Sequence, residues 1–480
     1  MEDPFNRDVK YLPEAVDTFL IEISNTIGFP VDQVKSLLCL LVNIPLGFFV
    51  SFGLASNYTA KHLFFALMGF AQLFFCYGYH MYHPIGTAAI TYLALYIFPR
   101  KKLHYFGMIF PVFYLSFLHI YRQYYDYGGF RMDITSPQMV LTQKMCSIAF
   151  DLYDGTTKKE EDLTPTQKKL ALKKVPSLLH YIGYMFNFTT VTTGPSSSFK
   201  EYLAGVETDY TKKDSPNPTM FVLKSFLFGL GWGLFHTLVG QYVSKELFFN
   251  EETQSMPLYL RPLIIHATAV QIRSLYYFAW ALADCSSVAA GLGYQGNGNW
   301  FVQVQPFSIE MPMNMRDITS CWNRGTNNWL RRYAYERVSP SYAQFYTFML
   351  SAFWHGFYPG YYLFFFIANF MNEIARQCRR QFRAKYIDET EKLLNGSRAL
   401  KVLYDIVGGY ITVFMMSYIG IVFSSFSLEK ALIVFKYVYF VPLIGEALVF
   451  AYFKMGAKKN RKSKKGTSQE VGSSETKKEK

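Results

Sequence analysis

Long apolar runs separated by short polar stretches dominate this chain. A helix needs about 20 mainly apolar residues to cross a lipid bilayer. Such runs lie near 35–55, 62–81, 85–99, 104–121, 219–242, 262–292, 343–371, 403–426 and 429–453, and shorter runs near 137–153 and 176–193 are typical of re-entrant or tilted segments. The run at 85–99 is short, and 262–292 fits one long helix or two pieces. The pattern therefore predicts about nine to eleven membrane segments.

The predicted fold class is an all-α polytopic membrane protein whose transmembrane or re-entrant helices enclose a reaction chamber. Tyr, Ser, Thr, Asn and Gln interrupt the apolar runs, and this mixture suits a bundle around a polar cavity. We expect an N-terminal segment at 1–34, a membrane-embedded catalytic domain at 35–453 and a disordered basic tail at 454–480. The N-terminus lacks the basic and short apolar regions of a cleavable signal peptide, so the first apolar run is expected to be an uncleaved anchor.

The net charge of +13 at first suggests a nucleic-acid-binding protein. Residues 454–480, however, hold ten Lys/Arg and three Glu, a net charge of +7, while the other residues hold 38 basic and 32 acidic side chains, a net charge of +6. We therefore expect no nucleic-acid partner. Lys477 and Lys478 resemble a dilysine retrieval signal, which implies the endoplasmic reticulum membrane and a cytosolic C-terminus. A chance pair in a lysine-rich tail is the alternative.

Basic residues flank the run at 343–371 on both sides, with Arg331, Arg332 and Arg337 before it and a cluster from Arg376 onward after it. Basic clusters mark cytosolic loops, and one straight span cannot place both of its ends in the cytosol. Helix-breaking residues stand between 356 and 360. Backbone freed by such breaks is tolerated where it is buried in protein or lines a cavity. The pattern predicts a broken or hairpin helix.

His355 lies within this run, among residues 345–366, which contain almost no other ionisable group apart from tyrosines. An ionisable side chain at membrane depth is costly and is a functional candidate by default. A neutral histidine hydrogen-bonded to a neighbouring helix is the structural alternative. We assign no function to most of the other eight histidines.

Several short motifs accompany His355. It stands in Trp-His-Gly-Phe-Tyr-Pro-Gly-Tyr-Tyr at 354–362, and Asn323 stands in Trp-Asn-Arg-Gly-Thr-Asn-Asn-Trp-Leu at 322–330. Earlier motifs are Asp-Ile-Thr at 133–135 with Gln-Lys at 143–144, Gly-Pro at 194–195 with Phe-Lys-Glu-Tyr at 199–202, Tyr-Tyr-Phe-Ala-Trp at 276–280 and Gly-Leu-Gly-Tyr-Gln-Gly at 291–296. In this order, the motifs resemble those of the membrane-bound O-acyltransferase family, in its lysophospholipid acyltransferase branch.

By that resemblance, His355 corresponds to the family's catalytic histidine and Asn323 to its paired asparagine. Forming an ester from an alcohol and an acyl thioester requires removal of a proton from a poor nucleophile, and histidine performs this near neutrality. The Asn323 amide can donate to the thioester carbonyl or hold the acceptor hydroxyl, and the sequence leaves both roles open. Cys321 and Ser351 carry no nucleophile motif, so we expect direct attack by the acceptor hydroxyl.

The resemblance also implies two substrates, acyl-CoA and a lysophospholipid, in a lipid bilayer. Candidate substrate-binding residues are Trp322, Trp354, Arg324, Arg331, Arg332 and Tyr361. Arginines suit the phosphates of acyl-CoA, and Arg337 is a further candidate. The alternative is that these arginines only orient the membrane segments.

The leading hypothesis is acyl-CoA-dependent transfer of a fatty acyl group to the free hydroxyl of a lysophospholipid, which remodels membrane phospholipid. The alternatives are transfer to another alcohol, such as a sterol, diacylglycerol or protein serine, and a lipid transporter or scramblase. We expect acyl-CoA as co-substrate, no cofactor and no metal, since the six cysteines show no metal-ligand spacing. Oligomeric state, head-group preference and acyl-chain preference are not indicated by the sequence.

Overall fold

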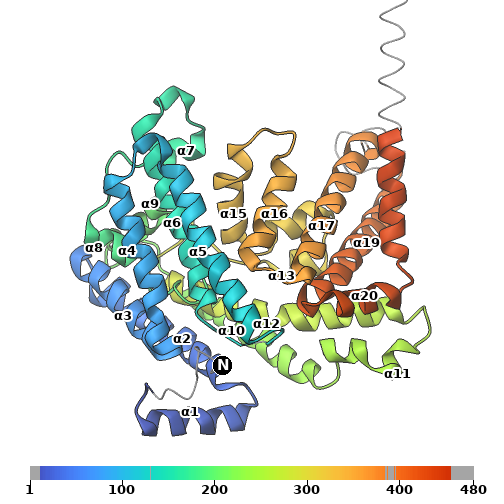
Figure 1. Ribbon diagram of the computed structural model, residues 1–480, viewed down its shortest axis with the longest axis horizontal. Helices are drawn as coiled ribbons and strands as arrows, with labels where there is room; N and C mark the ends of the chain where they lie inside the picture. Colours follow the sequence, from blue (N-terminus) through green and yellow to red (C-terminus); the bar gives the residue numbers. More distant parts are fainter. Residues whose placement is uncertain (1–10, 130, 384–385, 388–393, 395, 456–480) are drawn as a thin grey trace, which may run out of the picture.

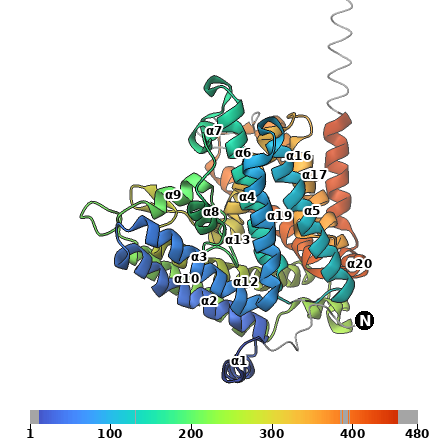
Figure 2. The same cartoon turned by 60° about the vertical axis from the view of Figure 1, so that its left-hand side comes forward.

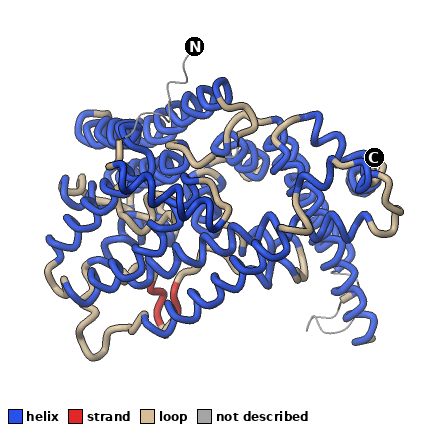
Figure 3. The backbone as a smooth tube through the Cα atoms, turned by 90° about the horizontal axis from the view of Figure 1, so that it is seen from below, coloured by secondary structure: helices blue, strands red, loops and turns tan. Residues whose placement is uncertain are grey.

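The structure, a computed structural model, describes residues 11–129, 131–383, 386–387, 394 and 396–455. The described chain is almost entirely helical, as predicted (Figures 1 and 3). Its first half contains α1 (Glu14–Ile27), α2 (Val31–Phe48), α3 (Tyr58–Tyr77), α4 (Tyr82–Ile97), α5 (Leu103–Tyr125), α6 (Thr135–Thr157), α7 (Pro165–Leu170), α8 (Leu178–Met185), α9 (Phe199–Val206) and α10 (Thr219–Gly240).

The second half begins with α11 (Glu251–Gln254) and α12 (Arg261–Ala289), which is one continuous helix rather than two pieces. A short antiparallel hairpin of β1 (Tyr294–Gly296) and β2 (Asn299–Trp300) follows. The remaining helices are α13 (Pro306–Glu310), α14 (Met315–Cys321), α15 (Arg324–Tyr333), α16 (Ala343–His355), α17 (Pro359–Cys378), α19 (Arg398–Ser425), α20 (Leu428–Tyr437) and a last helix at Val441–Met455.

Five stretches of the described residues are long and apolar enough to cross a membrane. They are Val31–Gly53, Tyr58–Ile97, Arg100–Tyr125, Thr219–Phe249 and Arg398–Ser425. The helices Leu428–Tyr437 and Val441–Met455 meet at 85° and give a sixth span if they are counted together. The count of nine to eleven is therefore not confirmed. Helices such as α6 fall outside this set because charged and polar side chains interrupt them.

Helix α6 packs against both α4 and α5 in the amino-terminal half (Figure 2). It is buried on nearly every side, including the side chains of Lys144 and Asp151. The Lys144 ammonium donates to the carbonyls of Tyr184 and Met185 at 2.9 and 3.2 Å and to the Thr190 hydroxyl at 2.9 Å. Because the ammonium is satisfied within the protein, the helix is accommodated inside the bundle despite its charge. The segment expected to be re-entrant or tilted is thus a 23-residue core helix.

Helices α16 and α17 form the predicted hairpin (Figure 1). Gln344 donates to the backbone carbonyl of Asn369 at 2.9 Å, and the rings of Phe348 and Phe365 lie 6.4 Å apart. Each pair is symmetric about the break that follows His355, as two antiparallel helices require. Both basic flanks therefore end on the same side of the molecule, which resolves the topological conflict seen in the sequence.

The predicted domain boundaries remain predictions. The segment 1–34 includes α1, and the domain at 35–453 includes all helices from α3 to α20. The basic tail and its lysine pair fall almost wholly outside the described residues, which end at Met455.

Candidate active site

His355 is the last residue of α16 and lies at the turn of the α16–α17 hairpin. Its ring stacks on Phe365 of α17 at 5.4 Å between centroids, and it meets Phe423 of α19 edge-on at 5.1 Å. The Tyr361 ring is 5.7 Å away. These contacts hold the imidazole in an aromatic environment formed by α17 and α19. An environment of low polarity disfavours imidazolium, which keeps the ring neutral and able to accept a proton.

The turn after His355 depends on two glycines. Gly356 has φ 118° and ψ −160°, a conformation that side chains rarely adopt. A Cβ on Gly360 would lie 2.5 Å from the Val422 carbonyl oxygen, so α17 can approach α19 this closely only with glycine there. The backbone amide of Gly360 donates to the Phe426 carbonyl at 2.9 Å. Together these features fix the end of the helix that carries His355.

His119 of α5 lies directly against this turn, and its sequence context predicts no role for it. Its Nε2–H donates to the Trp354 carbonyl at 3.1 Å, since a carbonyl can only accept. A Cβ on Gly356 would stand 3.2 Å from His119 Cγ. Carbonyls in the last turn of a helix lack intrahelical partners, so His119 satisfies one of them. In the sequence, His119 stands out only because it lies in an apolar run. Purely structural histidines occupy such runs too, so this position does not reveal its role.

Asn323 is the N-cap of α15 and adopts the left-handed conformation, with φ 40°. Asparagine tolerates this conformation better than most residues and is a strong N-cap. Its Oδ1 accepts from the Thr326 backbone amide at 3.4 Å and from Gln303 Nε2 at 2.8 Å. The Asn323 side chain therefore supports the local fold through its oxygen.

The hydrogen bonds of Gln303 determine the positions of the oxygen and nitrogen atoms in the side-chain amides of Gln303 and Asn323. Gln303 Oε1 accepts from the Gly325 backbone amide at 3.0 Å, and a backbone amide can only donate. The other end of Gln303 must then be the NH₂ group, so the Asn323 atom facing it is the oxygen. Gln303 is itself anchored, because its backbone amide donates to the buried Asp284 carboxylate at 2.8 Å. This leaves the NH₂ group of Asn323 without a hydrogen-bond partner in the described part of the chain, and thus available as a donor.

The motifs that are spread along the sequence converge on the start of α15. Gln143 of α6 donates to the Thr326 hydroxyl at 2.9 Å. A Cβ on Gly325 would lie 3.1 Å from the carbonyl oxygen of Ser196, beside the Gly-Pro motif. Segments about 180 residues apart, such as Gln143 and Thr326, therefore build the environment of Asn323 together.

Helices α15 and α16 pack against each other, with the Trp329 and Trp354 rings 6.2 Å apart. Trp354 Nε1 also donates to the Met139 carbonyl of α6 at 3.0 Å. Asn323 stands at the N-terminus of α15 and His355 at the C-terminus of α16, so both occupy the ends farther from the α15–α16 connection. No hydrogen bond joins their side chains within the described residues.

The predicted aromatic residues divide between these two sites. Trp322 meets Trp280 at 5.0 Å and Tyr276 at 5.7 Å, both on α12. Tyr361 lies beside His355, 4.5 Å from the Phe423 ring.

The arginines that follow Asn323 have different surroundings. Arg332 pairs with Glu201 of α9 at 2.9 Å, and Arg337 pairs with the buried Asp154 at 2.7 Å. Burial raises the pKa of the Glu201 carboxyl, but the hydrogen bond and charge of Arg332 lower it by more. The net result is a pKa below the usual value. Arg324 donates to the Val302 carbonyl at 3.0 Å.

Arg331 is the most open of the predicted arginines that the structure pairs with a carboxylate. Its side chain is 53% exposed, and its contact with Glu336 is long, at 3.7 Å. A weak exposed pair of this kind leaves the guanidinium accessible to another anion.

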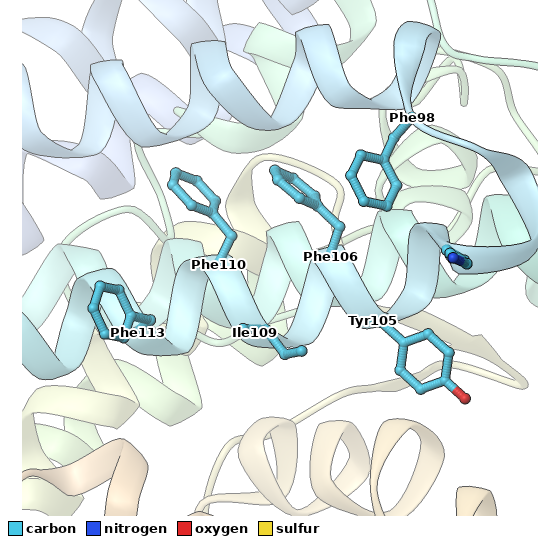
Figure 4. A pocket seen from close by; sticks show the side chains of 7 residues that line it. Phe98, Tyr105, Phe106, Ile109, Phe110 and Phe113 are labelled. Atoms are coloured by element: carbon cyan, nitrogen blue, oxygen red, sulfur yellow. The ribbon is translucent and has the colours of Figure 1, made fainter.

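A hollow of about 410 Å³ lies on the outer side of α5, away from both candidate residues (Figure 4). Its lining includes Phe98, Phe106 and Phe110, with Tyr105 and Ile109 at the rim. Tyr105 and Ile109 are 60% and 65% exposed, as expected for a surface that faces lipid. The predicted reaction chamber remains a prediction.

Comparison with known proteins places this geometry in a family. The family model described as MBOAT, membrane-bound O-acyltransferase family, matches residues 119–418. Membrane-bound glycerophospholipid O-acyltransferase 2 of Gallus gallus is 32% identical over 483 residues, covering 94% of this chain and 90% of the relative. The Homo sapiens protein of the same name is 31% identical, covering 96% and 92%. A lysophospholipid acyltransferase of Schizosaccharomyces pombe is 28% identical, covering 91% and 90%. The chain therefore belongs to the membrane-bound O-acyltransferase family of multi-pass acyl-transferring enzymes.

Proposed function

We propose that this enzyme is an acyl-CoA-dependent lysophospholipid O-acyltransferase, with His355 as general base and Asn323 as the donor to the reacting carbonyl. The observation that carries the proposal is the similarity, over about nine tenths of the chain, to relatives named for glycerophospholipid and lysophospholipid acyl transfer. The positions of His355 and Asn323 at the ends of two packed helices support the residue assignments.

In the proposed reaction, the neutral imidazole of His355 accepts the proton of the lysophospholipid hydroxyl as its oxygen attacks the thioester carbonyl carbon. The carbonyl oxygen gains negative charge, and the free NH₂ group of Asn323 donates to it. The carbon–sulfur bond then breaks, the new ester is released, and the CoA sulfur takes the proton from His355. We expect this chemistry to need no metal or prosthetic group.

The hairpin also supports a location for the reaction within the bilayer. Helix α16 has 13 residues, which corresponds to about 20 Å. If its basic flank lies at the membrane surface, His355 lies well inside a hydrocarbon core of about 30 Å. We propose that this flank and the C-terminus face the cytosol and that the membrane is that of the endoplasmic reticulum. Arg331 is then the best placed candidate for a phosphate of acyl-CoA, with Arg324 as a second.

The test is acyl transfer by the purified full-length chain. Labelled acyl-CoA is offered with a panel of lysophospholipids, and in parallel with a sterol, diacylglycerol and a serine-containing peptide. We expect labelled phospholipid and little product from the other acceptors. Product from only a sterol, diacylglycerol or peptide would establish the alternative acceptor. Absence of transfer to every lysophospholipid would refute the proposal.

A further inference from the structure

The fold brings together three potential metal ligands that lie far apart in the sequence. His62 is near the start of α3, His180 is in α8, and Glu207 follows α9. One side-chain donor atom from each lies within 4.8 Å of the other two. The histidines are 118 residues apart, and Glu207 follows His180 by 27 residues, so the cluster does not form a short sequence motif. It is separate from His355 and Asn323, which lie on α16 and at the start of α15.

His62 has the hydrogen-bonding pattern of a metal ligand. Its side chain is completely buried, and its Nδ1 lies 2.9 Å from the Tyr202 hydroxyl. Its Nε2 is buried with no hydrogen-bond partner in the described part of the chain. A metal-bound histidine commonly donates through one ring nitrogen to a protein oxygen, which fixes the tautomer and leaves the other nitrogen's lone pair for the metal. If Nδ1–H donates to Tyr202, Nε2 carries that lone pair.

The surroundings hold the His62 ring in place. A Cβ on Gly183 of α8 would stand 2.7 Å from the Tyr202 hydroxyl and 3.3 Å from His62 Nδ1. Gly183 thus lets α8 approach the His62–Tyr202 pair. His180 is one turn earlier on the same helix, and its ring centroid is 4.3 Å from that of His62. The close approach at Gly183 therefore brings the second imidazole to the first.

Lys61 fixes the segment that carries the carboxylate. Its Nζ donates to the carbonyls of Val206 at 3.3 Å and Thr208 at 2.9 Å, the residues on either side of Glu207. The ammonium is bound to backbone oxygens, and Glu207 itself is exposed. The nearby positive charge weakens cation binding, while the anchored backbone keeps the Glu207 side chain next to both histidines.

We propose that His62, His180 and Glu207 bind a zinc ion that clamps α3, α8 and the end of α9 together. Two imidazole nitrogens and one carboxylate oxygen suit Zn²⁺, with water as the fourth ligand at the exposed edge. Ligand atoms around tetrahedral zinc are about 3.3 Å apart at bond lengths of about 2.0–2.1 Å. The three donor atoms lie within 4.8 Å of one another, so zinc binding would draw them together by up to about 1.5 Å. We expect the half-buried His180 and the exposed Glu207 side chains to rotate to do so. Mg²⁺ and Ca²⁺ prefer oxygen ligands and do not suit this set.

The experiment uses the full chain purified in detergent without a polyhistidine tag, stripped with chelator and then titrated with Zn²⁺. Metal analysis after dialysis should find about one zinc per chain, with a dissociation constant below about 10 μM. Saturating zinc should raise the thermal midpoint by about 3 °C. Co²⁺ in place of zinc should give the visible absorption of a tetrahedral nitrogen and oxygen site.

The informative variants are His180→Asn and Glu207→Gln, because both side chains are at least partly exposed and their replacement preserves the fold. The double variant should lose zinc binding and the rise in thermal midpoint. Tyr202→Phe removes the partner of His62 and should weaken binding about 10- to 100-fold. His104→Asn is the matched control, since His104 Nδ1 is also buried without a partner among the described residues but belongs to no ligand cluster found there.

Two results would overturn the proposal. One is equal zinc binding by the wild type and the double variant. The other is no binding by the wild type at 100 μM zinc, roughly tenfold above the expected dissociation constant. Loss of binding in His104→Asn to the same extent would do so as well. None of these results depends on acyl transfer, so they are separate from the test of the proposed function.

Discussion

Asn323→Asp separates the structural role of this residue from its proposed catalytic role. The structure uses only the side-chain oxygen of Asn323, which accepts from Gln303 and from the Thr326 amide. Aspartate keeps an oxygen in that position, is an equally good N-cap and tolerates the left-handed conformation. The substitution removes the free NH₂ donor. We therefore expect a stable protein that lacks one hydrogen bond to the developing oxyanion.

The magnitudes differ enough to be measured. Loss of one oxyanion donor lowers kcat by about 10²–10³-fold, or about 3–4 kcal/mol. The effect of Asn323→Asp on the free energy of unfolding should stay within about 1 kcal/mol. Asn323→Ala, in contrast, loses the cap, worth about 1 kcal/mol, and leaves the Gln303 NH₂ group unpaired, at a cost of about 1–3 kcal/mol. Alanine should therefore lower both stability and activity, whereas aspartate should lower activity alone.

The assay combines steady-state acyl transfer with thermal unfolding of the same samples. Asn327→Asp is the matched control, because Asn327 is exposed on the same helix and the change adds the same charge. It should retain wild-type kcat and KM. If Asn323→Asp keeps activity within about tenfold of wild type, the amide is not an oxyanion donor and the inference from the Gln303 network is wrong.

Two further predictions concern the turn that carries His355. Gly360→Ala places a methyl group 2.5 Å from the Val422 carbonyl oxygen and should destabilise the protein by about 1–3 kcal/mol. Gly420→Ala should not, because Gly420 lies on α19, the helix that carries Val422, with open space where a Cβ would stand. Equal thermal midpoints for the two variants would refute the packing argument. His119→Phe removes the donor to the Trp354 carbonyl and should lower kcat about tenfold or more through displacement of His355. An unchanged kcat would show that His119 does not position the catalytic turn, and an unchanged KM with a lowered kcat would support that role.

The periodicity and breaks of the sequence predicted the helical fold and the hairpin at 343–371 because both depend on local properties. The cluster of glycine and proline at 356–360 ends α16 and begins α17, whereas the single prolines at 45 and 111 lie inside continuous helices. Basic flanks constrain topology directly. The isolated position of His355 in an apolar run likewise singled it out without any structure. These predictions need no knowledge of which helices are neighbours.

Other features depend on long-range contacts and could not be read from the sequence. The Lys144 ammonium disrupts the apolar pattern of α6, and only the carbonyls supplied by another segment explain its burial. The orientation of the Asn323 amide follows from Gln303, twenty residues away, and the role of His119 follows from a contact 235 residues along the chain. A single sequence does not show which polar groups satisfy one another.

The arginines illustrate the same limit. Arg331 and Arg332 are adjacent and alike in sequence, yet one is largely exposed and the other is paired with Glu201 of a distant helix. The predicted number of membrane spans rested on local hydropathy alone. Helices buried in protein and helices that face lipid have similar compositions, so hydropathy alone does not fix the number of spans.

The most direct test of the account is a single-turnover measurement with wild-type and His355→Ala protein, each loaded with labelled acyl-CoA and mixed with lysophospholipid. His355→Asn serves as a second variant that keeps a polar side chain among Phe365 and Phe423. The account predicts labelled phospholipid from the wild type and a loss of at least about 100-fold in both variants, at near wild-type acyl-CoA binding and thermal stability. Transfer by stably folded His355→Ala within about tenfold of the wild type would contradict the assignment of His355 as general base.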